Sequence, residues 1–371
     1  MKHFERRGFK ESLDKAIASI ARAYGFAGTP STLPKKNIAD ADNETQENTL
    51  LIASLAGAGD ASAYNVQSWG VLRAKGTSRV IFTVQNPKHA IAQAFVVKAS
   101  LATAEAAGLT DCKVLLTSVG DDESRRRYLR EAGNFFKKHA KEIQESFPEM
   151  RTHEDPDGSI QAIAESDHAL AASLPRTIDY LSESSRKVML ETISLLESLG
   201  IPYELTARLP YTPEINRELV FAIEGMNDAG EAQIIATGGR FQSPRHGKET
   251  KKNEANIIGI AVSVPETLDM RNMESDEDPA CFVVHVGEAA RLKAFGLLDS
   301  LWRARIVLDQ AILAEGISDQ MQRANKSGAK YVTIIGQREA LDGTAILKNV
   351  STQLQETVPL DRLLTRLSRV R

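Results

Sequence analysis

The chain has 371 residues, which allows about two or three domains of roughly 150 residues each and excludes a miniprotein held together by disulfides. The composition, 42% hydrophobic and 26% charged, is ordinary for a globular protein, and the apolar runs fall far short of the ~20 residues that a membrane-spanning helix needs. The formal net charge of −3, taken alone, argues against a nucleic-acid partner.

The first 85 residues predict a helix, a connection and a hairpin. Apolar side chains recur at helical spacing over residues 11–24, and Gly25 marks the end of that helix. Residues 35–59 show no strong period, and we interpret them as a surface connection that could contain a short helix. Two β-like runs within residues 71–85, separated by a turn-prone stretch, predict a hairpin.

The middle of the chain combines helices with strands. Helices are predicted over residues 89–107, after Gly120 and over 182–199, strands over 113–119, 203–205, 218–223, 232–236 and 257–264, and a loop over the acidic residues 153–167. The last four strands are spaced like an antiparallel meander with long insertions. This part of the chain therefore predicts a body built from a sheet and helices.

A linker divides this body from the end of the chain. Residues 267–279 are rich in acidic side chains, poor in apolar ones, and end in Pro279. Beyond them, strands are predicted over 282–286, 305–308, 330–336 and 345–348, helices over 289–303, 318–326 and 360–370, and a hairpin turn at Asp342-Gly343. We therefore predict a domain boundary at the linker and a compact α/β domain after it.

Charge is distributed unevenly between these two parts. Residues 281–371 contain 13 Lys and Arg against 9 Asp and Glu, a net charge of +4, which leaves −7 for residues 1–280. The C-terminal part is thus mildly basic and is attached to an acidic body. The overall charge of −3 therefore hides a part of the chain that suits an anionic partner.

The last domain contains a distinctive stretch of sequence. It is the segment Ser318-Asp-Gln-Met-Gln-Arg-Ala-Asn-Lys-Ser-Gly-Ala-Lys-Tyr-Val-Thr-Ile-Ile-Gly336, followed by Glu339, Gly343 and Lys348. In this order and spacing, these residues resemble the anticodon-binding domain of class II aminoacyl-tRNA synthetases such as the histidyl, glycyl, threonyl and prolyl enzymes.

The body carries further marks in chain order. They are Ala23-Tyr-Gly-Phe26 with Thr29-Pro30, Gly108-Leu-Thr-Asp111 with Thr117-Ser-Val-Gly120, Ile178-Asp-Tyr-Leu-Ser182, Leu199-Gly-Ile-Pro-Tyr203, the stretch from Ala207 to Phe221, and Ala236-Thr-Gly-Gly-Arg-Phe241. Together they resemble the catalytic domain of histidyl-tRNA synthetase.

This resemblance implies an α+β fold in two domains. A class II synthetase-like antiparallel sheet with helices is expected over residues 1–275, and an α/β domain of the anticodon-binding type over residues 280–371. The resemblance also implies a homodimer that forms through the first helix and the strand at Pro30.

Three elements that the family uses to handle ATP depart from its pattern. The path from Pro34 to Trp69 is about half as long as in the family and lacks the Arg-x-Glu hairpin, so motif 2 is largely missing. Motif 3 ends in Pro265-Glu-Thr267 where the family has Glu-Arg-Leu, and Tyr211 replaces the catalytic arginine of the histidine signature. Electrostatic stabilisation is usually the largest catalytic contribution, so these losses predict a protein without ordinary adenylation.

We therefore assign no catalytic residue and predict a histidyl-tRNA synthetase-like pseudoenzyme that binds tRNA or a tRNA-like RNA, or acts as a regulatory paralogue. Polar groups that converge in a sheet cleft suit a small ligand, and the candidates for a residual histidine-like pocket are Arg208, Glu214, Gln233, Gly238, Gly239 and Arg240. A structural role stays open for them, since Gly238-Gly239 would also suit a turn.

The candidates for RNA contacts lie in the basic last domain. Lys and Arg contacts to phosphates supply most of the sequence-independent affinity for nucleic acid, and the candidate residues are Arg323, Lys326, Lys330, Arg338 and Lys348. For each of these residues, an ordinary solvated charge is the alternative interpretation.

Two other functions stay open. One is an active but divergent histidine-tRNA ligase that uses ATP and Mg²⁺ and supplies its arginines from other positions, and the other is a histidine-sensing regulatory subunit. Otherwise no cofactor and no metal site are expected, because Cys112, Cys281 and the scattered histidines lack ligand spacing. The charged start of the chain has no apolar signal core and predicts a cytoplasmic protein, with neither membrane nor DNA as a partner.

Overall fold

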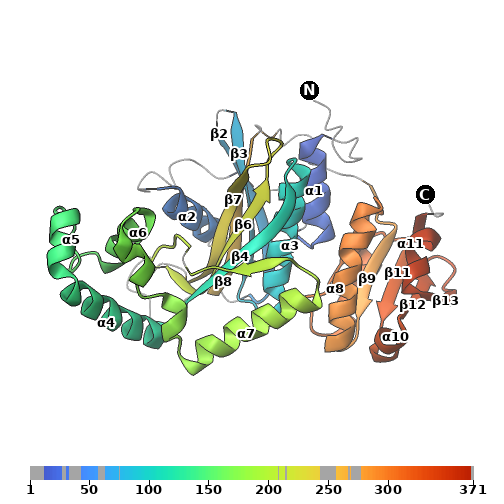
Figure 1. Cartoon of the computed structure of the whole chain (residues 1–371). Helices are drawn as coiled ribbons and strands as arrows, with labels where there is room; N and C mark the ends of the chain where they lie inside the picture. The colour runs from blue at the N-terminus through green and yellow to red at the C-terminus, as the bar shows by residue number, and fades with distance from the viewer. Residues whose placement is uncertain are drawn as a thin grey trace.

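The structure of the protein is a computed structural model that describes residues 12–26, 31–32, 43–56, 63–74, 76–207, 209–213, 215–242, 256–265, 268 and 277–368. Within these residues the strands form two sheets, sheet A with eight strands and sheet B with five. Figure 1 shows sheet A in the middle of the molecule and sheet B on the right, in the C-terminal part of the chain.

Sheet A is mainly antiparallel. Its strands are β1 (Ser31–Thr32), β2 (Val66–Ala74), β3 (Thr77–Gln85), β4 (Thr110–Gly120), β5 (Tyr203–Leu205), β6 (Asn216–Met226), β7 (Ala232–Gln242) and β8 (Asn256–Val264), in the spatial order β1-β2-β3-β8-β7-β6-β4-β5. The predicted hairpin is β2 with β3. The pairs β1 with β2 and β4 with β5 are parallel, so β5 does not continue the predicted meander.

Helices cover both faces of sheet A. On one face, α1 (Leu13–Ala23), α3 (Ile91–Ala106) and α7 (Glu183–Ser198) pack over the apolar residues of the strands. On the other face, α2 (Glu44–Ala56) packs against β3, β7 and β8, and Figure 1 shows it on the side of the sheet opposite α3.

The burial of α2 corrects the prediction of a surface connection over residues 35–59. Leu51 and Ile52 are fully buried, and the polar side chains of Asn48 and Thr49 are buried as well. Because polar residues share the buried face with apolar ones, the helix has only a weak apolar period, and its packing could not be read from that period.

A helical extension projects from the body on the left of Figure 1. It consists of α4 (Asp122–Lys138), α5 (Ala140–Ser146), α6 (Pro156–Glu165) and the 3-10 turns η3 (Ala169–Ser173) and η4 (Thr177–Tyr180). The prediction of a loop over residues 153–167 is wrong, because α6 occupies most of this range. Asp155 caps α6 by accepting a hydrogen bond of 2.9 Å from the Gly158 N–H, Pro156 occupies its first turn, and Ile160 and Ile163 are buried.

Sheet B follows at the C-terminal side. Its strands are β9 (Cys281–His285), β10 (Leu308–Gln310), β11 (Tyr331–Ile335), β12 (Thr344–Asn349) and β13 (Gln355–Pro359), in the order β10-β9-β11-β12-β13. One face carries α8 (Glu288–Arg303), α10 (Gln337–Asp342) and α11 (Leu360–Ser368), and the other carries α9 (Ile317–Lys326). This confirms an antiparallel sheet A followed by an α/β domain.

The connection from β11 to β12 differs from the prediction. Asp342-Gly343 is not the turn of a simple hairpin, because α10 lies between the two strands. Gly343, with φ of +66°, adopts the left-handed conformation that ends this helix. The strand β13, which pairs with β12, was not predicted from the sequence.

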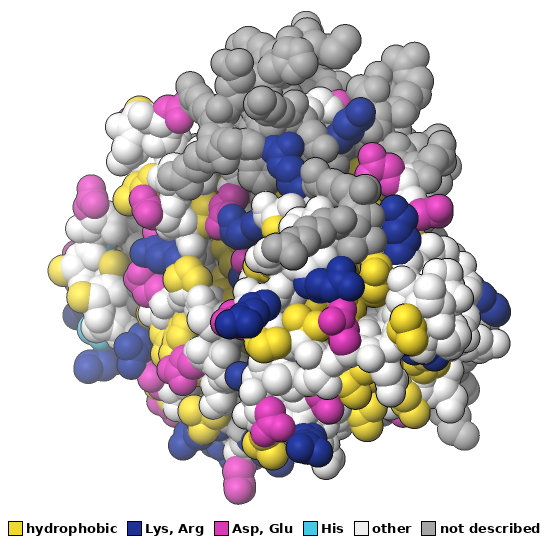
Figure 2. All heavy atoms as spheres, turned by 90° about the vertical axis from the view of Figure 1, so that its right-hand side faces the viewer, with side chains coloured by type: hydrophobic (Ala, Val, Ile, Leu, Met, Phe, Trp, Pro, Cys, Tyr) yellow, Lys and Arg dark blue, Asp and Glu magenta, His cyan; other side chains and the backbone are white. Residues whose placement is uncertain are grey.

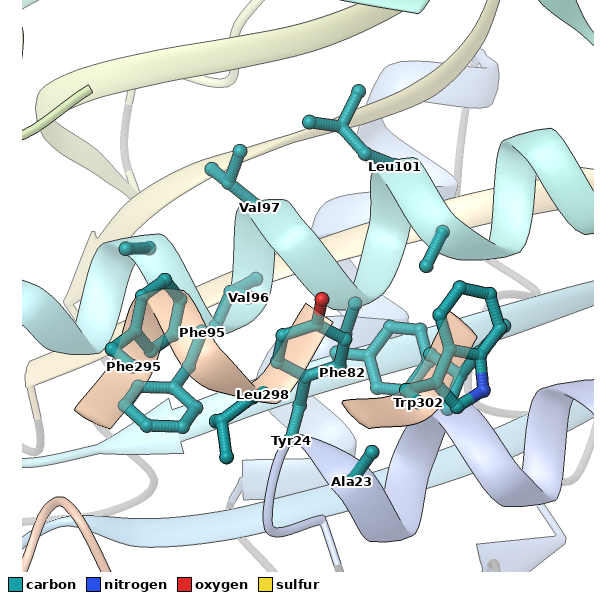
Figure 3. Packing of buried hydrophobic residues seen from close by; sticks show 14 of the residues in the cluster. Ala23, Tyr24, Phe82, Phe95, Val96, Val97, Leu101, Phe295, Leu298 and Trp302 are labelled. Carbon is teal, nitrogen blue, oxygen red and sulfur yellow. The ribbon is translucent and has the colours of Figure 1, made fainter. Parts of the chain in front are cut away.

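The two sheets are joined by aromatic packing between α1, α3 and α8 (Figure 3). The rings of Phe95 and Phe295 meet edge to face with centroids 4.6 Å apart, and Trp302 is 4% exposed. The hydroxyl of Tyr24 donates a hydrogen bond of 3.1 Å to Asp299, and burial raises the pKa of Tyr24. The described strands up to Val264 thus belong to sheet A, and those from Cys281 belong to sheet B. One apolar core contains residues from both parts of the chain.

Among the helices of the described residues, none combines the length and the apolar character that crossing a membrane requires.

Candidate functional site

The predicted pocket residues that the structure describes do not all lie together. Arg208 and Glu214 lie outside the described residues. Gln233 is exposed near the start of β7, whereas Arg240 is half-buried near its end, and seven residues of strand at ~3.3 Å each separate them by roughly 23 Å. The structure therefore does not bring Gln233 and Arg240 to the same site.

Gly238 and Gly239 lie inside β7 rather than at a turn. A Cβ atom on Gly238 would lie 2.1 Å from the carbonyl oxygen of Gly259, and a Cβ atom on Gly239 would lie 2.4 Å from that of Leu219. Both distances are shorter than any side chain tolerates, so glycine is needed for the close packing of β7 against its neighbours. This geometry explains the two glycines without a ligand.

Arg240 is held by protein groups. Its Nε donates a hydrogen bond of 3.0 Å to Oδ1 of Asn256. Burial lowers the pKa of Arg240, and the carboxylate of Glu218 opposes that effect. In register, Arg240 lies opposite Ile258, whose side chain belongs to the core under α3, so the arginine points to the α3 side of the sheet and away from α2.

Glu218 is the strained member of this region. Its φ of +59° is left-handed, which is uncommon for a residue other than glycine, and the register of β6 shifts at this point against both β4 and β7. Burial raises the pKa of its carboxyl group, and one carboxylate oxygen has no hydrogen-bond partner. Such strain is often found at functional positions, and no sequence pattern marks it.

Asp121 organises a neighbouring cluster of serines where α4 and α7 begin. It accepts hydrogen bonds of 2.8 Å from Ser124 N–H and from Ser182 Oγ, and one of 3.0 Å from Ser184 Oγ. Burial alone would raise the pKa of Asp121, but these hydrogen bonds outweigh burial and hold the pKa well below its usual value. The cluster connects the first turns of α4 and α7 to the end of β4 in sheet A. Both carboxylate oxygens of Asp121 accept hydrogen bonds within the cluster.

Helix α2 closes the sheet face that α3 does not cover. The Nδ2 of Asn48 donates a hydrogen bond of 2.8 Å to Oγ1 of Thr237 on β7. Arg79 of β3 points to the same face, where it forms ion pairs with Glu44 and Glu47 of α2. The cation that the β2–β3 hairpin places on this face is therefore neutralised by the helix that covers it.

The predicted RNA contacts fall into two places on the C-terminal part. Lys326 ends α9, Lys330 precedes β11, and Lys348 lies opposite Val332 at the same end of sheet B. Arg338 is on α10 beyond the other end of β11, so roughly 16 Å of strand, at ~3.3 Å per residue, separates it from the lysines.

The charges on this side of the molecule are mixed. Figure 2, which faces the right-hand side of Figure 1, shows Lys and Arg interspersed with Asp and Glu rather than joined in one basic field. Arg338, for example, pairs with Asp342 at 3.4 Å. The described residues on this side of the molecule therefore show no broad basic surface in view, and a phosphate-binding site is better sought in a cleft that brings several cations together.

A cleft of about 640 Å³ lies where the body meets the C-terminal part, and we call it the junction cleft. Residues from distant segments line it, among them Arg22, Tyr64, Lys88, Glu315, Arg323 and Lys326. Its walls are tied together by ion pairs between Arg22 and Asp309 at 2.7 Å and between Lys88 and Glu315 at 3.1 Å. Two of the predicted RNA contacts, Arg323 and Lys326, thus lie in a cleft.

A second cavity of about 370 Å³ lies between η4, α7 and β5 and is lined mainly by apolar side chains such as Leu181, Met189 and Leu205. Neither this cavity nor the junction cleft is lined by a residue of β7. Tyr64 and Lys88, which do line the junction cleft, were missed from the sequence, because no local signal relates them to α9.

In comparisons with protein families and with individual known proteins, the chain is similar to the following. A family model described as "Anticodon binding domain" matches residues 280–369. The histidine-tRNA ligase of Geobacillus kaustophilus is 32% identical over 270 residues, which cover 70% of this chain and 62% of the relative. That of Symbiobacterium thermophilum is 28% identical over 299 residues, which cover 78% of this chain and 67% of the relative.

Among solved structures, the apo histidyl-tRNA synthetase of S. aureus aligns over 96% of this chain and 94% of its own, with a TM-score of 0.44 and 20% identity. The matched part of the chain spans about 60% of the length of relatives such as the histidine-tRNA ligases of Geobacillus kaustophilus and Geobacillus sp. (strain WCH70).

Proposed function

The chain is a histidyl-tRNA synthetase-like member of the class II family, and from this premise we propose that it binds tRNA, or a tRNA-like RNA, without carrying out ordinary adenylation. The match of residues 280–369 to an anticodon-binding model supports the RNA partner. So does the mildly basic charge of this part, since phosphate contacts from Lys and Arg supply most sequence-independent affinity.

The proposal that adenylation is lost rests on the ion pairs that Arg79 forms with two glutamates. Adenylation needs cations around the α-phosphate of ATP, and the resemblance places arginines of the motif 2 hairpin, which is largely missing before Trp69, in that role. The β2–β3 hairpin, which contains Trp69, is the hairpin that the chain retains next to this segment. In the described part of the β2–β3 hairpin the arginines are Arg73 and Arg79, and Arg79 is paired with Glu44 and Glu47. A triphosphate at this position would have to compete with two carboxylates of the same chain.

The packing of α2 supports the same conclusion. Leu51 and Ile52 are fully buried against β3 and β8, and Ile52 fills the space next to Gly259. A nucleotide lying on this face of β7 and β8 would have to displace α2 and expose these side chains to water, which is costly. The sheet face is therefore better suited to holding a helix than to holding ATP.

Assembly and location complete the proposal. We expect a homodimer, and because the apolar face of α1 packs against α3 and α8 within the chain, α1 would contribute its polar face to such a dimer. We also expect the protein to act in the cytoplasm, where tRNA is found, with neither a metal nor another cofactor needed for RNA binding.

Binding and exchange measurements on the purified chain test the proposal. We expect unfractionated tRNA to shift the protein in an electrophoretic assay, while calorimetric titrations with ATP and with histidine give no heat of binding. Histidine-dependent pyrophosphate exchange at rates usual for a ligase would overturn the proposal and support the divergent ligase. Binding of histidine without ATP or tRNA would instead support a histidine-sensing subunit.

A further inference from the structure

We infer that the junction cleft binds one unpaired nucleotide of RNA, with the ring of Tyr64 stacking on the base and Arg323 and Lys326 contacting the neighbouring phosphates. This inference rests on the proposed RNA-binding function and adds the place at which an unpaired nucleotide is held. It also assigns a role in RNA binding to the body, through Tyr64.

The cleft has the size and construction of a ligand site. Its volume of about 640 Å³ lies within the roughly 300 to 1,000 Å³ usual for small-ligand pockets. Arg22 connects its two walls, because it forms an ion pair of 2.7 Å with Asp309, in which both side chains are mostly buried, and donates a hydrogen bond of 2.8 Å to the carbonyl of Glu277. Because these contacts hold the walls before any ligand arrives, binding loses little free energy to rearrangement of the protein.

Tyr64 supplies the surface on which a base can stack. Tyr64 is 64% exposed, and every other Phe, Tyr and Trp among the described residues is buried or half-buried. The ammonium group of Lys88 lies 4.7 Å from the centre of its ring and occupies one ring face. Proteins that bind unpaired RNA bases use exposed aromatic rings in this way, since every base has a π-face.

Two cations of α9 lie in the same cleft and are available to phosphate. Arg323 pairs with Asp319 at 3.0 Å, but both side chains are about half exposed, and exposed ion pairs of this kind contribute little stability. Among the described residues, Lys326 has no ion-pair partner. Phosphate oxygens can therefore replace the weak partner of Arg323 and provide the first partner of Lys326.

This arrangement favours an unpaired nucleotide over a duplex. In a duplex the bases are stacked inside the helix, so Tyr64 would find no free base face, and only the backbone could reach Arg323 and Lys326. An unpaired nucleotide offers its base and its phosphates together. The cleft thus predicts a preference for loops and single strands.

Substitution of Tyr64 provides the first test. With unfractionated tRNA or a short single-stranded oligouridylate as the probe, fluorescence anisotropy should show that Tyr64→Ala weakens binding roughly 5- to 150-fold, the range usual for loss of one base stack. Tyr64→Phe, which keeps the ring, should bind like the unsubstituted chain. A blunt RNA duplex should bind more weakly than the single strand, and equal affinity for the two would overturn the inference.

The salt dependence of binding provides the second test. The double variant Arg323→Ala, Lys326→Ala should lower the slope of log K against log salt by about 1.4, which corresponds to two lost phosphate contacts at ~0.7 each. The matched control is Arg127→Ala, Lys187→Ala, which removes two exposed cations from i,i+4 pairs on α4 and α7, far from the cleft, and should leave the slope unchanged.

The outcomes separate this inference from the proposed function. If the unsubstituted chain binds tRNA but neither Tyr64→Ala nor the α9 double variant weakens binding, the cleft is not the site, while the proposed function stands. If the unsubstituted chain binds none of the RNA probes, the proposed function itself fails. A melting temperature close to that of the unsubstituted chain shows that each variant is folded and that its RNA affinity can be compared.

Discussion

Two arginines of sheet A and one of the junction cleft have different kinds of partner. Arg240 is half-buried beside Glu218 and donates to Asn256, and Arg79 is paired with two glutamates of α2. Arg323, in contrast, is exposed in the junction cleft, and among the described residues its ion-pair partner is Asp319 on its own helix.

Burial explains the difference. A charge that leaves water must be compensated inside the protein, so the partners of a buried arginine become part of the fold. An exposed charge keeps a weak, exchangeable partner and stays available to a ligand. Substitutions under α2 should therefore act on stability, and substitutions in the cleft on RNA binding, and the following predictions test that division.

The largest expected effect comes from the packing of α2. Ile52→Ala should lower the free energy of unfolding by about 2 to 5 kcal/mol, because Ile52 is fully buried and its removal leaves a cavity against sheet A. Urea unfolding measures this change. The control Leu341→Ala removes a side chain that is 86% exposed and should change stability by less than about 0.5 kcal/mol. Similar small effects for both would show that α2 does not rest on the sheet.

Loss of the cap at the start of α4 should have a smaller effect. Asp121→Ala should cost about 0.5 to 2 kcal/mol, since Ser124 N–H loses its acceptor. Because hydrogen bonds lower the pKa of Asp121 in the folded state, its contribution is present above the usual Asp pKa of ~3.9 and is lost as the pH falls below it. Unfolding curves between neutral and acidic pH should show this loss in the unsubstituted chain and not in Asp121→Ala.

Glu218 should show the opposite dependence on pH. Burial raises the pKa of this carboxyl group, so the folded state holds its proton to higher pH than the unfolded state does. Stability is then lost as the pH rises from the usual Glu pKa of ~4.3 through the raised value. Glu218→Gln removes the ionisation and should be more stable than the unsubstituted chain at neutral pH. A variant less stable at neutral pH would contradict the prediction.

The smallest effect is expected for Arg338. This residue lies beyond the far end of β11 from the lysines and is paired with Asp342. Arg338→Ala should therefore leave the salt dependence of RNA binding unchanged, whereas Lys326→Ala should lower its slope by about 0.7. Equal changes would mean that the RNA also covers α10 and that the cleft is only part of the contact surface.

The sequence predicted most elements because their signals are local. The helix now called α7 was predicted from its apolar period and its start at Ser182, which accepts a hydrogen bond from Ser185 N–H as an N-cap. The β2–β3 hairpin likewise followed from two β-like runs around a turn. The α6 helix was missed although Asp155 and Pro156 form a readable start, because its acidic surroundings favoured a loop.

The candidate pocket was less predictable. From the sequence, Gly238 and Gly239 were candidates either for a ligand pocket or for a structural turn, but they are required by backbone contacts with Leu219 and Gly259 on neighbouring strands. The strain at Glu218 likewise follows from shifts in strand register on both sides of β6. Neither feature has a local sequence signal, since both depend on which strands become neighbours.

The sequence by itself determined the class of fold, the basic character of the last domain and the family that the chain resembles, because periodicity, composition and motif spacing are properties of short segments. Only the tertiary structure decided that α2 covers sheet A and that Tyr64 of the body shares a cleft with Arg323 of α9. The physical reason is that burial and clefts arise from contacts between residues far apart in the chain, whose pairing no local pattern records.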